Sequence, residues 1–304
     1  MDEAHRVDGS DEQRHTPTEE QLFNESVYLD VVDASGNVGG YVRLGLYPNL
    51  GVIWWTAAVT IAGRGPIVAA RYDLAAPADG FDIDDAGVKV SYLIDRALES
   101  VTVKASSPAK SFATPESAYD DAQGEDLGLS MDLTWATAGV PYHYAITTRY
   151  EIPCTVSGTI TVGGEEFRVA GPGQRDHSWG VRDWWSFGWC WSAIHFDDGR
   201  KLHLADIRID GVPPLGYLQR DGHVETLQVA NTTEVTNAQG IASSAHFVIE
   251  PGGFTVEVTP TGFGPLLLVS DEGKIDRFPR AMVEATTSDG VFGRGWIEWN
   301  QPQL

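Results

Sequence analysis

The sequence predicts an all-β protein made of two antiparallel β-barrel or β-sandwich domains packed together. Apolar and polar residues alternate with a period of two in many short segments, which is typical of strands with one buried face. Helical periodicity is almost absent, and 33 Gly and 16 Pro fit the tight turns between short strands. About twenty segments of this kind are more than one small barrel needs, so we expect two β domains.

The expected elements follow one another along the chain. Residues 1–20 are acidic and lack periodicity, which predicts a disordered tail. The first domain, residues 21–170, opens with a hairpin across a Gly-, Asn- and Asp-containing turn at 33–37. The second domain, residues 171–304, opens with the motif GQRDHSWG at 173–180. The expected strands span 27–32, 40–47, 51–60, 67–72, 88–93, 101–105, 127–135, 143–151, 154–162, 165–169, 186–196, 201–209, 215–220, 224–229, 245–249, 254–259, 266–269, 280–285 and 293–299.

The composition excludes several classes of partner. A net charge of -22 argues against nucleic acid or an anionic membrane surface, and it favours a neutral or cationic small ligand. The two cysteines, Cys154 and Cys190, form neither a disulfide framework nor a metal-binding spacing. The sequence shows no signal peptide and no long apolar run, so we expect a cytoplasmic protein without a membrane span.

The densest chemistry lies in residues 171–185, which hold two Arg, two Asp, one His, three Trp and three Gly. The alternation that follows places Trp189, Trp191 and His195 on one face of a strand, and we locate the candidate active site there. Arg175 and Arg182 are expected to be structural, because an arginine next to aspartate and tryptophan can form a clamp that holds two sheets together.

Three stretches carry a resemblance to a known family: the motif at 173–180, residues 39–49 and residues 295–300. The motif resembles that of the lipocalin-like hydroxyneurosporene synthase (carotenoid 1,2-hydratase) superfamily, whose relatives include fungal cyclases that promote Diels–Alder chemistry. The three stretches together are similar to a bacterial two-barrel family of unassigned function. The resemblance implies a pair of lipocalin-like β-barrels whose interior or interface holds a hydrophobic ligand. It does not imply a particular substrate, because fold does not fix activity.

The candidate residues suit acid chemistry at a carbon–carbon double bond. Hydration or cyclisation of an alkene begins with protonation by a carboxylic acid, which burial can keep protonated by raising its pKa. We expect Asp176 or Asp183 to be this acid, with His177 as an orienting or proton-relaying partner. Asp206, on an otherwise apolar strand face, is a third candidate, and Glu298 is a weaker one. Indole faces would stabilise the carbocation by on the order of 2 kcal/mol when desolvated. The expected substrate-binding residues are Tyr41, Trp55, Trp179, Trp184, Trp189, Trp191, His195 and His203.

These residues predict an enzyme that hydrates, cyclises or isomerises an isoprenoid- or terpenoid-like small molecule without a cofactor. One alternative is a non-catalytic carrier of an apolar ligand. Another is a cyclase that accelerates its reaction only by folding the substrate into a reactive conformer. The spacings of His177, His195 and His203 match no known metal motif, so we expect no metal.

Overall fold

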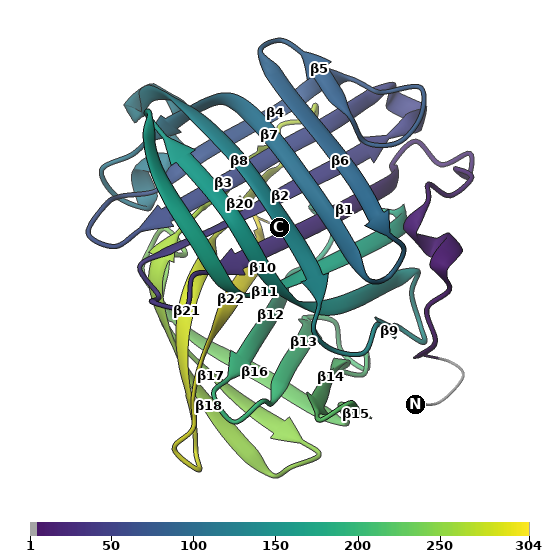
Figure 1. The fold of residues 1–304 in the computed structure, drawn as a ribbon, viewed down its shortest axis with the longest axis vertical. Coiled ribbons are helices and arrows are strands. Elements are labelled where there is room, and N and C mark those ends of the chain that lie inside the picture. The colour runs from purple at the N-terminus through teal and green to yellow at the C-terminus, as the bar shows by residue number, and fades with distance from the viewer. Residues whose placement is uncertain (1–4, 304) are drawn as a thin grey trace.

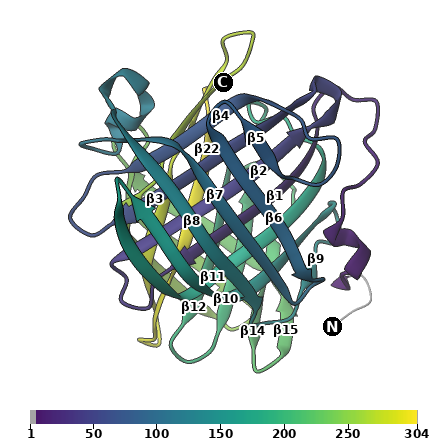
Figure 2. The same cartoon turned by 45° about the horizontal axis from the view of Figure 1, so that its top comes forward.

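The computed structural model describes residues 5–303 and confirms the all-β prediction. Two large curled antiparallel sheets pack against each other, the first drawn in purple to teal and the second in green to yellow (Figures 1 and 2). The helices among these residues are short 3-10 turns, namely η2 (Gly9–Glu12), η3 (Pro48–Leu50), η4 (Glu116–Tyr119) and η5 (Asp121–Gln123). None of the helices within residues 5–303 could span a bilayer.

The first sheet closes on itself. Its strand β4 pairs with β3 on one side and with the end of β7 on the other, where Ile67 lies opposite Ser111. A closed ring therefore runs through β4, β3, β2, β1, β11, β10, β8 and β7, while β6 and β5 extend beyond β7 and β9 pairs with β10. The strands are β1 (Phe23–Val32), β2 (Val38–Tyr47), β3 (Val52–Ile61), β4 (Ile67–Ala75), β5 (Ile83–Asp85), β6 (Val88–Arg96), β7 (Ser100–Ser111), β8 (Glu125–Thr137), β9 (Tyr142–His143), β10 (Arg149–Val162) and β11 (Glu165–Val181).

The second sheet has the order β15-β14-β13-β12-β22-β21-β18-β17-β16. Asp206 of β13 accepts hydrogen bonds from the backbone N and the hydroxyl of Thr232 of β16, at 3.0 and 2.7 Å, so a side chain joins these two strands. The hairpin of β19 and β20 pairs with the end of β22. The strands are β12 (Trp189–Phe196), β13 (Lys201–Ile207), β14 (Leu215–Arg220), β15 (His223–Thr226), β16 (Val229–Thr236), β17 (Ala242–Glu250), β18 (Phe254–Phe263), β19 (Leu266–Val269), β20 (Ile275–Phe278), β21 (Arg280–Thr287) and β22 (Phe292–Pro302).

Side-chain alternation sorts the apolar residues into three buried clusters. One fills the first sheet, a second fills the second sheet, and a third lies between them. On β12, Cys190 and Ile194 face the second core, whereas Trp189, Trp191 and Ala193 face the first sheet. Every residue of β1 and of β2 is buried, because one face of these strands covers a core and the other face covers the second sheet.

The structure corrects the predicted tail for residues 5–20, while residues 1–4 lie outside the described range. Val7 and Glu12 are buried, and Glu12 accepts a hydrogen bond from Arg175 at 2.8 Å and another from the backbone N of Leu98 at 3.0 Å. The acidic composition of this segment suggested solvation, but the buried pair of Glu12 and Arg175, together with Val7 in the first core and hydrogen bonds from His15 to Glu25, anchors it to the first barrel.

The predicted domain boundary at residue 170 falls inside β11. Gly171 and Gly173 lie within this strand, which passes very close to β1. A Cβ atom on either glycine would lie 2.0 or 2.2 Å from a backbone carbonyl oxygen of β1, that of Val32 or Asp30. Because β11 pairs within the first sheet and β12 within the second, we propose that the domains meet in residues 182–188.

We expect Glu12→Gln to destabilise the protein by about 3 kcal/mol, because it leaves the guanidinium of Arg175 buried without a charged partner. The free energy of unfolding, measured by chemical denaturation, checks this. Glu19→Gln, which removes the same charge from an exposed position, is the control and should change stability little. Equal stabilities of the two variants would contradict the anchoring role of Glu12.

Candidate functional site

A cleft of about 310 Å³ opens between the two sheets, at the end where β10 and β11 meet β12 and β13. Its mouth is apolar: Ile146, Val181 and Ile209 expose 58%, 58% and 43% of their surface there. Grouped exposed apolar side chains of this kind mark binding grooves. A smaller hollow of about 20 Å³ lies next to the cleft and shares several of its lining residues. We call this hollow the floor. The floor is lined by Ser26, Tyr28, Arg43, Arg149, Asp176, Ser178, Arg182, Trp184, Trp189, Arg280 and Glu298.

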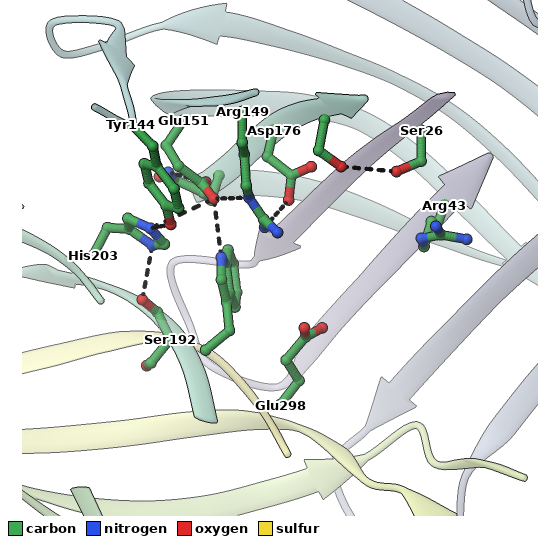
Figure 3. Close-up of polar contacts among 12 residues, drawn as sticks. Ser26, Arg43, Tyr144, Arg149, Glu151, Asp176, Ser192, His203 and Glu298 are labelled. Atoms are coloured by element: carbon green, nitrogen blue, oxygen red, sulfur yellow. Dashed lines mark hydrogen bonds and ion pairs between the residues drawn. The ribbon is translucent and has the colours of Figure 1, made fainter. Parts of the chain in front are cut away.

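Strand register brings the central charged residues together. Glu151 of β10 lies directly opposite Asp176 of β11, and Arg149 lies two residues before Glu151 on the same face. Arg149 donates from Nη2 to Asp176 at 2.5 Å and from Nε to Glu151 at 2.8 Å (Figure 3). One guanidinium therefore bridges two buried carboxylates.

Burial dominates the electrostatics of this pair. It raises the pKa of Asp176 to about 7, and the charge of Arg149 only partly opposes that effect. Burial also raises the pKa of Glu151, against the same arginine. Asp176 borders the floor, so the arrangement presents a carboxyl group that can hold and donate a proton near neutral pH.

The second barrel supplies a histidine behind this pair. The Nδ1 atom of His203 lies 3.1 Å from the carbonyl oxygen of Ser192, and Tyr144 hydrogen-bonds to Nε2 (Figure 3). Burial holds the pKa of His203 well below its usual range, so the ring is neutral. Because a carbonyl only accepts, Nδ1 carries the proton and Nε2 accepts the hydroxyl of Tyr144. Tyr144 itself lines the cleft.

Indole N–H groups bond to buried carboxylates around the cleft. Trp191 of β12 donates from Nε1 to Glu151 of the first sheet at 3.0 Å and so connects the two barrels, whereas Trp189 donates to Glu298 within the second sheet at 3.2 Å. Glu298 also accepts from Arg280 at 2.7 Å. Each tryptophan therefore presents a ring to the cleft while its N–H compensates a buried carboxylate.

Several of the predicted residues meet at this site. Asp176 and Trp184 border the floor, Trp189 borders both the floor and the cleft, and Trp191 lines the cleft. His203 lies directly behind Tyr144. Trp179 reaches the edge of the cleft but stacks on His15 at 3.7 Å between ring centroids. Arg182, predicted to be structural, lines both the cleft and the floor.

The structure separates His177 from Asp176, which corrects their predicted partnership. Consecutive strand residues point to opposite faces, so His177 lies inside the first barrel, where it hydrogen-bonds to Glu25. The side chains of His15, Glu25 and His177 form the one trio of possible metal ligands found in residues 5–303. Arg175 was predicted to clamp two sheets together, and it pairs instead with Glu12 within that barrel.

The other predicted residues lie away from the cleft. Asp183 accepts from the backbone N of Trp185 and from Ser186, which makes it a turn residue. Asp206 joins β13 to β16. The carboxylates of Asp183 and Asp206 are already hydrogen-bonded to neighbouring groups. The sequence pattern did not predict these hydrogen bonds. Three further residues lie outside the lining of the cleft: His195 on β12, Trp55 in the first core and Tyr41, whose hydroxyl donates to Gly264 O.

Five residues of the site were not predicted from the sequence: Tyr144, Arg149, Glu151, Arg43 and Arg280. One signal was present, because Arg149 and Glu151 place opposite charges two residues apart on one face of a predicted strand. A charged pair on a strand in the middle of a domain indicates a buried ion pair or a site. Their proximity to Asp176 depends on strand register, which a single sequence does not specify.

Comparison with known proteins agrees with this architecture. A family model described as "Domain of unknown function (DUF7064)" matches residues 8–303. No curated protein matches the sequence significantly. A candidate AttH protein from Nitrosomonas europaea has a similar structure, with a TM-score of 0.67 and 15% identity over 96% of this chain and 95% of its own.

Two further solved structures are similar over nearly the whole chain. Kievitone hydratase from Nectria haematococca has a TM-score of 0.58 and 11% identity, covering 95% of this chain and 96% of its own. CghA, solved with Sch210972, has a TM-score of 0.58 and 10% identity, covering 96% of this chain and 94% of its own. At these identities the similarity shows a shared two-barrel fold.

The decrease in the free energy of unfolding at low pH should depend on Glu25. Burial alone would raise the pKa of Glu25, but hydrogen bonds from His15 and His177 outweigh it and hold the pKa at about 2. Because this pKa is lower in the folded state, the carboxylate stabilises the fold above its unfolded pKa, and that contribution is lost as the pH falls toward about 2. The difference in unfolding free energy between wild type and Glu25→Gln, measured by denaturation from pH 7 to 3, should therefore shrink below about pH 4.5. A constant difference across this range would contradict the assignment.

Proposed function

The chain belongs to the DUF7064 family, and we propose that it is an enzyme that adds water to, cyclises or isomerises a carbon–carbon double bond of a hydrophobic small molecule. The observation that carries this proposal is Asp176, a buried carboxyl group at the floor of a cleft with an apolar mouth. The expected substrate is isoprenoid- or terpenoid-like. No cofactor is needed for such acid-initiated chemistry.

Asp176 is the proposed acid. Protonation of an alkene requires a carboxylic acid that keeps its proton near neutral pH, and burial raises the pKa of Asp176 to about 7. Proton transfer from Asp176 to one alkene carbon leaves a carbocation on the other. Trp189 and Trp191 line the cleft, and their rings would stabilise this cation by about 2 kcal/mol when water is excluded.

Tyr144 and His203 are the proposed route for the second proton. In hydration, the water that attacks the carbocation must lose a proton, which the neutral His203 can accept through the hydroxyl of Tyr144. In isomerisation, the same pair would remove a proton from the carbon next to the cation. This arrangement supports an enzyme over a simple carrier, which needs no proton relay. The similar fold of a protein named as a hydratase supports the same choice.

Asp176→Asn should lower turnover by roughly 10²- to 10⁴-fold while ligand binding changes little, because the amide keeps the shape of the carboxyl but cannot donate its proton. A panel of terpenoid and polyene substrates in ²H₂O and H₂¹⁸O checks this by mass spectrometry. Hydration introduces one deuterium on carbon and one ¹⁸O, whereas isomerisation or acid-initiated cyclisation introduces deuterium alone. Asp183→Asn, a turn residue outside the cleft, is the matched control. Normal turnover by Asp176→Asn would reject the acid mechanism and favour substrate preorganisation.

The pH dependence should follow the same carboxyl group. Asp176 acts in its protonated form, so the turnover rate should be constant below its pKa of about 7 and fall about tenfold per pH unit above it. Steady-state rates between pH 5 and 9 measure this directly. A rate that rises above pH 7 would instead indicate a group that acts as a base.

A further inference from the structure

The floor of the cleft carries more positive than negative side chains. Four arginines and two carboxylates line it. Arg149 pairs with Asp176, and Arg280 pairs with Glu298. Arg43 and Arg182 are left, and within residues 5–303 no carboxylate oxygen lies within 4.0 Å of either guanidinium. Arg43 is buried and Arg182 is half-buried. Charges that are withdrawn from water are normally paired, so these two call for an explanation.

Arg43 is held in place without a charged partner. Its exposed fraction is 6%, and its Nη2 atom donates to Asn24 Oδ1 at 3.1 Å. The guanidinium lies 4.9 Å from the centre of the Trp184 ring. A Cβ atom on Gly45 would lie 2.3 Å from Nη1 of Arg43, so the glycine leaves the space that the guanidinium occupies. The fold therefore makes room for a buried cation and does not neutralise it.

Arg182 approaches the same place from the segment after β11. Its guanidinium lies 5.7 Å from the Trp184 ring, and its side chain makes one long hydrogen bond, at 3.4 Å, to Ser178. Burial and repulsion from Arg149 and Arg43 lower the pKa of Arg182 to about 10. An anion next to these guanidiniums would offset both the cost of their burial and the repulsion between them.

We propose that Arg43 and Arg182 form an anion subsite that binds an acidic oxygen group of the substrate, such as a carboxylate. Both guanidiniums lie within 5.7 Å of the centre of the Trp184 ring and border the floor, so a small oxygen group in the floor would approach both of them. Guanidinium groups recognise carboxylates through charge-assisted and often bidentate hydrogen bonds. The inference rests on the proposed function only in taking the cleft as the substrate site.

The subsite defines an amphipathic substrate class. The acidic group would lie in the floor at Arg43 and Arg182, and the apolar part would extend past Trp189 toward the mouth. A net charge of -22 disfavours anions over the protein as a whole. Local excess positive charge in the floor would therefore select the cleft as the place where an acidic molecule binds.

Binding of decanoate and of decanamide, which share one apolar chain and differ in charge, tests the subsite without any turnover. We expect wild type to bind decanoate about tenfold more tightly at pH 7.5, as measured by calorimetry and by tryptophan fluorescence. Arg182→Gln should reduce this ratio to near one, because it weakens the binding of decanoate much more than that of decanamide. Arg168→Gln, an exposed arginine far along β11, should keep the full ratio.

Equal affinities of wild type for the two probes, or an unchanged ratio in Arg182→Gln, would overturn the subsite. If Arg43→Gln folds, it should also lower the ratio of decanoate to decanamide affinity. If Arg43→Gln does not fold, the ratio measured for Arg182→Gln is the test. The outcome is separable from the proposed function. If wild type shows no preference for decanoate but its turnover depends on Asp176, only the anion subsite is rejected. A carboxylate preference without such turnover rejects the proposed acid catalysis and keeps the subsite.

Discussion

The structure depends on the alternation of side chains in strands that are buried on both faces. Each sheet curls around an apolar core, so the outer faces of β1, β2, β10 and β11 must be covered by the second sheet. Hydrogen bonds across the interface between the two sheets hold them together: Trp296 donates to the carbonyl of Val31 at 2.9 Å, and Gln174 donates to Tyr217 at 3.0 Å. Polar groups on these outer faces are removed from water without entering either core. Most of them therefore need hydrogen-bond or charge partners within the interface between the sheets.

That requirement accounts for the chemistry of the cleft. A charged group at the interface between the sheets loses its hydration. Glu151 and Glu298 are stabilised there by N–H donors from arginine and tryptophan side chains. The pKa of Asp176 rises for the same reason, since one arginine does not fully offset its burial. The energetic penalty of burial and the capacity to donate a proton near neutral pH therefore have one physical origin.

The two barrels contribute differently to the site. The interior of the first is filled by large side chains such as Trp55 and Trp135, and the segment around Glu12 is anchored to Arg175 within it. The ligand is therefore expected between the barrels and not in the lumen of this one. Each barrel would supply one half of the proposed chemistry: Arg149 and Asp176 come from the first, and His203 and Trp191 come from the second. A shift of one barrel against the other would separate the proton donor from its aromatic lining.

The sequence by itself determined the all-β class, the positions of most strands and the two faces of β12, because a period of two is a local property of the chain. Residue types alone also drew attention to Asp176, Trp189 and His203, which the structure places at the floor or behind Tyr144. Tertiary structure alone decided that Arg149 lies beside Asp176, that His177 points away from it, and that Glu12 is anchored instead of solvated. These facts depend on strand register and on contacts between segments far apart in sequence, whose energies leave no periodic trace in the chain.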